Sequence, residues 1–81
     1  MDDKSTFRAH GHMADYRKIL GTNLREARKA AGLSQEALAL EIGIDRTYIS
    51  GIERGVRNPS LDVIVKLAER VGVEPGRLLV G

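Results

Sequence analysis

The chain has 81 residues, with 13 Lys and Arg against 11 Asp and Glu, so its formal net charge is only +2. This length suits one small domain, and the absence of Cys excludes a disulfide framework and a cysteine-based metal site and fits a reducing cytoplasm. One Phe, two Tyr and no Trp are too few aromatic residues for a single-strand stacking platform, and no apolar run approaches the roughly 18 residues of a membrane span.

Residues 1–13, MDDKSTFRAHGHM, show no hydrophobic period, and we expect them to form a flexible tail. Gly11-His12-Met13 also fits a cloning scar before a second start, so a partial tag is the alternative to a native tail. His10 and His12 form an HxH pair, which offers too few ligands for a metal site. We expect no cofactor, and one folded domain over residues 14–81.

The first predicted helix covers residues 16–31 and is followed by Gly32, a typical helix-ending residue. Its apolar residues repeat at helical spacing and are expected to face inward: Leu20, Leu24, Ala27 and Ala31. Its basic residues are interpreted as solvated outer positions, a few of which could reach a phosphate backbone: Arg17, Lys18, Arg25, Arg28 and Lys29.

Two short helices are predicted next, with a glycine corner between them. Ser34 can cap the first, and Gly43 supplies the left-handed conformation that ends it. Ala39 is small enough to let the two helix backbones approach, while Leu38 and Ile42 form an apolar stripe. Asp45 can cap the following helix, residues 46–53.

The helix over residues 46–53 has an apolar and a polar side. Ile44, Ile49 and Ile52 are expected to face inward. The opposite side is free to touch a ligand and carries Asp45, Arg46, Thr47, Ser50, Gly51 and Arg54. Arg46, Arg54 and Arg57 form a local basic edge, and Glu53 is expected to pair with Arg54, Arg57 or an arginine of the first helix.

The C-terminal part predicts two more helices, which makes an all-α, compact five-helix domain. Asn58-Pro59-Ser60 is a turn and cap that starts a helix over residues 61–71, closed by Gly72. Its inward residues are expected to be Leu61, Ile64, Leu67, Ala68 and Val71. Pro75 fits the first turn of a short fifth helix that contains Arg77, Leu78 and Leu79.

The run QEALALEIGIDRTYISGIER, residues 35–54, resembles the helix-turn-helix of phage-repressor-like regulators of the Cro/C1 (XRE) type. The resemblance extends over about residues 16–79, and DRTYISGIERGVRNPS is most similar to controller proteins of restriction-modification systems. It implies a repressor-like domain whose third helix enters the major groove of double-stranded DNA while the second helix crosses above the backbone.

Under this resemblance, Arg46 is the main candidate for reading a base, because a guanidinium matches the O6 and N7 acceptors of guanine. Thr47 would add a hydrogen bond or a contact to a thymine methyl. Asp45 could accept from cytosine, although capping is the favoured role. Tyr48 either packs on the DNA or belongs to the core.

Gln35 matches a family position that clamps a phosphate at a helix N-terminus. Its alternative role is that of a plain exposed helix former. The phosphate contacts would continue along Ser50, Arg54, Arg57 and Asn58, each of which is alternatively solvated surface.

One module of this size reads few base pairs, so we expect a homodimer on a palindromic operator with half-sites about 34 Å apart. The C-terminal half has more apolar residues than one small core easily uses, and the interface candidates are Val63, Val73, Leu79 and Val80. The alternative is that some of them complete the monomer core.

The expected function is that of a homodimeric transcriptional regulator, and the controller resemblance implies that it regulates its own gene. The sequence offers no Cys, no His outside the tail and no glycine-rich phosphate loop, so we do not expect an enzyme. The alternative is an antitoxin-like or adaptor module whose main partner is another protein.

Overall fold

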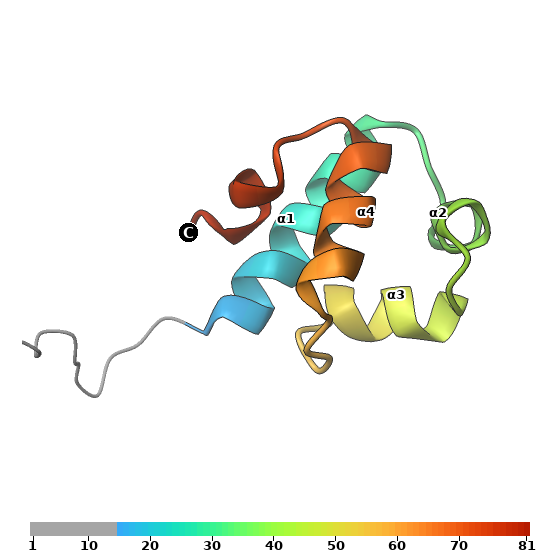
Figure 1. The fold of residues 1–81 in the computed structure, drawn as a ribbon. Helices are drawn as coiled ribbons and strands as arrows, with labels where there is room; N and C mark the ends of the chain where they lie inside the picture. Colours follow the sequence, from blue (N-terminus) through green and yellow to red (C-terminus); the bar gives the residue numbers. More distant parts are fainter. Residues whose placement is uncertain (1–14) are drawn as a thin grey trace, which may run out of the picture.

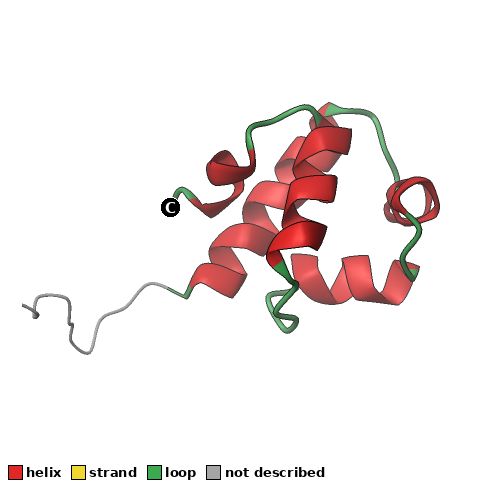
Figure 2. Cartoon of the chain, viewed as in Figure 1, coloured by secondary structure: helices red, strands yellow, loops and turns green. Residues whose placement is uncertain are grey.

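The computed structural model describes residues 15–81, and this part of the chain is entirely helical, without a strand (Figure 2). The predicted all-α class is confirmed, with the fifth element as a 3-10 helix. The elements in chain order are α1 (Tyr16–Ala30), α2 (Gln35–Ile42), α3 (Arg46–Glu53), α4 (Leu61–Val71) and η2 (Pro75–Leu79) (Figure 1). The predicted tail, the tag alternative and the HxH pair lie outside the described residues.

Local side-chain chemistry sets the helix boundaries. Ser34, Asp45 and Ser60 each accept a backbone hydrogen bond from the first turn of α2, α3 and α4, as predicted. Asp15 does the same for α1, a cap that the sequence pattern had not indicated. α2 ends at Gly43, whose φ of 76° is in the left-handed region where a Cβ would be strained.

The core lies between α1 and α4, which run beside each other; α3 packs on α1, α2 packs on α3 and α4, and η2 packs on α1 and α4 (Figure 1). Leu24, Ile49, Ile52 and Leu67 are fully buried there. Gly21 allows α1 and α3 to approach closely, because a Cβ at this position would lie 2.5 Å from the carbonyl oxygen of Ile52.

Two residues predicted to face inward are exposed. Leu61 is 70% exposed because the buried face of α4 is centred on Ile64, Leu67, Ala68 and Val71, and Leu61 lies at its edge in the first turn. Ala31 is exposed because α1 ends one residue earlier than predicted, and Ala31 is the C-cap from which the chain turns away.

Candidate nucleic-acid interface

The corner between α2 and α3 is closed by backbone hydrogen bonds. The N–H groups of Gly43 and Ile44 both donate to the carbonyl of Ala39, at 2.9 and 3.0 Å. Ala39 itself is buried, as the predicted crossing of the two helices requires. These bonds hold the three-residue turn, residues 43–45, against the end of α2. They therefore restrict the orientation of α3 relative to α2.

The first turn of α3 presents Arg46 and Thr47 to solvent, and Asp45 organises it. The carboxylate of Asp45 accepts from the backbone N–H of Thr47 at 2.9 Å and from its hydroxyl at 2.8 Å. These two bonds hold the pKa of Asp45 below its ordinary value. The favoured capping role of Asp45 is confirmed, and the Thr47 hydroxyl proton is already engaged.

The exposed side of α3 forms one stripe. Arg46, Ser50 and Arg54 are four residues apart and so lie above one another on one helix face. Arg46 and Arg54 are exposed and Ser50 is half-buried. Among the described residues no hydrogen bond or ion pair holds the Arg46 guanidinium, which leaves its donors available to a ligand.

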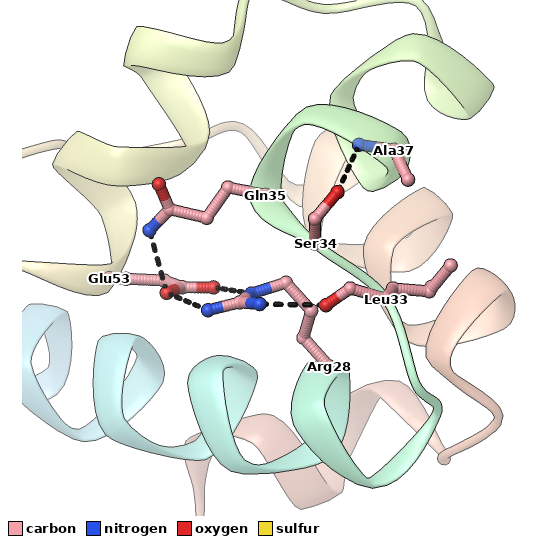
Figure 3. Close-up of polar contacts among 6 residues, drawn as sticks. All are labelled: Arg28, Leu33, Ser34, Gln35, Ala37 and Glu53. Atoms are coloured by element: carbon pink, nitrogen blue, oxygen red, sulfur yellow. Dashed lines mark hydrogen bonds and ion pairs between the residues drawn. The ribbon is translucent and has the colours of Figure 1, made fainter.

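A buried ion pair between Arg28 of α1 and Glu53, the last residue of α3, links these two helices (Figure 3). Arg28 Nε donates to Glu53 Oε2 at 2.6 Å and Arg28 Nη2 donates to Glu53 Oε1 at 2.9 Å, while Nη1 donates to the Leu33 carbonyl at 2.7 Å. The two side chains are only 9% and 4% exposed. The predicted outer position of Arg28 is wrong, and the predicted pairing of Glu53 with an arginine of the first helix is confirmed.

Burial and hydrogen bonding act on Glu53 in opposite directions. Burial raises the pKa of this carboxyl, but hydrogen bonds from Arg28 and Gln35 outweigh it and hold the pKa below its ordinary value. The hydrogen bond to Glu53 in turn raises the pKa of Arg28. Both groups are therefore charged at neutral pH and stabilise each other.

Gln35 connects α2 to this ion pair. Its Nε2 donates to Glu53 Oε1 at 3.0 Å, and the side chain is half-buried (Figure 3). A plain exposed helix former would have no such partner. The amide keeps a second N–H and its carbonyl oxygen, so Glu53 holds Gln35 in place without using all of its hydrogen-bonding capacity.

Arg57, in the loop after α3, folds back over that helix. Its guanidinium carbon lies 5.6 Å from the centroid of the Tyr48 ring, within the range of a cation–π interaction. Its Cγ would lie 2.6 Å from a Cβ at Gly51. Gly51 is therefore buried, and the prediction that it is free to touch a ligand is wrong. Tyr48 is half-buried and packs against the core.

The interface candidates of the C-terminal half divide into two pairs. Val63 and Val73 are half-buried and pack against the core, whereas Leu79 is 37% and Val80 60% exposed.

Asn58, the last of the predicted phosphate contacts, is exposed. The described residues hold no cluster of His, Cys, Asp and Glu that could bind a metal. None of their helices is both long and apolar enough to cross a membrane.

Comparison with known proteins identifies relatives over most of the chain. A family model described as helix-turn-helix matches residues 24–78. The control protein C.BamHI of Bacillus amyloliquefaciens is 48% identical over 64 residues, which cover 78% of this chain and 79% of that protein.

Solved structures of controller proteins share the fold. The restriction-modification controller protein C.AhdI from Aeromonas hydrophila is 52% identical, covers 76% of this chain and 94% of its own, and superposes with a TM-score of 0.72. The controller protein C.Esp1396I, solved as a tetramer in complex with its natural 35 base-pair operator, is 29% identical over 82% of this chain and 87% of its own, with a TM-score of 0.70.

Proposed function

Since this chain belongs to the helix-turn-helix family and is a transcriptional regulator of the Cro/C1 type, we propose that it binds an inverted-repeat DNA operator as a homodimer. The observation that carries this proposal is the stripe formed by exposed Arg46, half-buried Ser50 and exposed Arg54, the C-cap residue of α3. The ion pair between Glu53 and Arg28 ties this helix to α1. An α-helix fits the major groove of B-DNA, where each base pair presents a distinct set of donors and acceptors.

The proposed base contacts come from the first turn of α3. Arg46 donates to the O6 and N7 atoms of a guanine, for which its exposed guanidinium, held by no other residue of 15–81, is suited. Thr47 offers its methyl group to a thymine, because its hydroxyl already donates to Asp45. Sequence discrimination therefore depends mainly on Arg46.

The proposed phosphate contacts surround these base contacts. Gln35 uses the N–H that Glu53 leaves free, at the N-terminal end of α2. Arg57 is held against Tyr48. We therefore expect the guanidinium and the aromatic ring to approach the sugar-phosphate backbone of the DNA together. Ser50, Arg54 and Asn58 extend the same track. Such contacts orient the protein on the duplex but carry no base information.

The homodimer is proposed to form through the C-terminal segment, where Leu79 and Val80 expose apolar surface. Val63 and Val73, which are half-buried against the core, are the other proposed interface residues. Two-fold symmetry then places two copies of α3 in successive turns of one groove, about 34 Å apart. A dimer also doubles the number of base contacts that a single small module makes.

Similarity to C.BamHI and C.AhdI supports a narrower proposal. We infer that this chain is the controller of a restriction-modification system, that it acts at the nucleoid in the cytoplasm and that it regulates its own promoter. A gene neighbourhood with a nuclease and a methyltransferase, and an inverted repeat upstream, would support it. Neighbours of unrelated function would count against it.

Selection of bound sequences from a random pool of DNA duplexes tests the main proposal. We expect enrichment of an inverted repeat with half-site centres about 10 base pairs apart. Enrichment of a single unrepeated motif would contradict the homodimer. Recovery without any enrichment would contradict sequence-specific binding altogether.

A further inference from the structure

The side chain of Asn23 in α1 binds the C-terminal segment at three points. Its Nδ2 donates to the carbonyls of Leu78 and Val80, both at 2.9 Å, and to that of Arg77 at 3.3 Å. These acceptors lie more than fifty residues further along the chain. One amide thus ties residues 77–80 to α1.

The C-terminal segment has few other means of keeping its shape. η2 is a single short 3-10 helix without a side-chain cap, and its closing bond from the Val80 N–H to the Arg77 carbonyl is long, at 3.4 Å. Leu78 is buried and anchors the segment from inside. Leu79 and Val80 are exposed, and within residues 15–81 the amide of Asn23 is the side chain that hydrogen-bonds to this segment.

We propose that Asn23 is a positioning residue for self-association, which holds residues 77–80 in the conformation that presents Leu79 and Val80 to a second copy of the chain. This inference rests on the homodimer proposed above. An amide group has two N–H donors and here meets three carbonyls, so at least one proton is shared. Only a donor group fits this position, because all three partners are acceptors.

The substitution Asn23→Asp tests this role with almost no change in shape. It replaces the N–H donors with a carboxylate oxygen that faces carbonyl oxygens, so the segment is expected to detach. Sedimentation of the full chain should show a dimer dissociation constant raised about tenfold or more, which corresponds to about 1.4 kcal/mol. Far-UV circular dichroism should still show the helices of the monomer.

Lys29→Gln provides the matched control, because it changes the net charge by the same amount at an exposed position of the same helix. It should leave the dimer dissociation constant unchanged. A wild-type chain that stays monomeric at high concentration would contradict the dimer and with it this role. An Asn23→Asp variant that dimerises like the wild type would contradict only the role of Asn23.

A second measurement needs no substitution and therefore does not depend on whether the variant folds. The chain has two asparagines, Asn23 and Asn58, and Asn58 is exposed. Proton exchange of their side-chain amides, followed by nuclear magnetic resonance on the DNA-free protein, should be clearly slower for Asn23. Equal exchange rates would overturn the inference.

Discussion

Arg28 in α1 and Glu53 at the end of α3 form a bidentate ion pair, with donor–acceptor distances of 2.6 and 2.9 Å. The pair is buried, and Gln35 extends it to the start of α2. Three helices therefore share one hydrogen-bonded carboxylate. This arrangement couples the position of the proposed phosphate contact at Gln35 to the position of the helix proposed to read bases.

Removal of the Glu53 charge should destabilise the fold strongly. Glu53→Gln keeps the shape of the side chain but leaves the buried Arg28 cation without its counter-charge, and breaking such a pair costs about 3 kcal/mol or more. Urea unfolding followed by circular dichroism measures the loss. Glu41→Gln is the control, because Glu41 pairs with Arg70 on the surface and its loss should be much smaller. Equal losses of unfolding free energy in the two variants would contradict the larger contribution assigned to the buried pair.

The stability should also depend on pH through Glu53. The pKa of this carboxyl in the folded protein lies below its ordinary value of 4.5, so its contribution is complete above that value and disappears as the pH falls through the lowered pKa. The free energy of unfolding of the wild type should fall more steeply with acidification below 4.5 than that of Glu53→Gln. Parallel pH profiles for the two proteins would contradict this assignment.

Gly21 should tolerate no side chain. A Cβ there would meet the carbonyl oxygens of Ile52 and Glu53 at 2.5 and 2.6 Å, so Gly21→Ala must push α1 away from α3, at a cost of about 1–3 kcal/mol. Gly76→Ala is the control, since a Cβ at that position would have nothing within 4 Å and the φ of Gly76 is not left-handed. Thermal unfolding of the two variants checks this prediction, which fails if both melt like the wild type.

Several features of the fold could be predicted because they depend on neighbours in sequence. The caps Ser34, Asp45 and Ser60 and the corner at Gly43 follow from the chemistry of a few adjacent residues. The misjudged position of Arg28 depends instead on a distant segment. The sequence pattern predicts Arg28 at the surface, because its partner Glu53 lies 25 residues further along the chain.

The same distinction applies to the candidate site. The polar stripe of α3 follows from helical periodicity, so Arg46 and Arg54 were found in the sequence. The burial of Gly51 depends on the path of the loop that brings Arg57 back over α3, and no local pattern encodes that path. The hydrogen bonds of Asn23 also join segments that are too far apart for periodicity to connect.

Arg57 should contribute affinity without selectivity. Arg57→Ala should weaken binding to specific and scrambled duplexes by similar factors, and the slope of log affinity against log salt should fall by about one for each protomer. Fluorescence anisotropy at several salt concentrations measures this slope. Lys66→Ala removes an equal charge from the exposed side of α4 and should leave the slope unchanged. An unaltered slope for Arg57→Ala would exclude its phosphate contact.

The central claim, that α3 reads DNA bases through Arg46, is tested most directly by mobility-shift titrations of the selected operator and a scrambled duplex. Arg46→Ala should reduce the ratio of the two affinities about tenfold or more, because a bidentate contact to guanine contributes about 1–3 kcal/mol of discrimination. Arg54→Ala, from the other end of the same stripe, should lower both affinities and preserve their ratio. An Arg46→Ala protein that retains the wild-type ratio would contradict the claim.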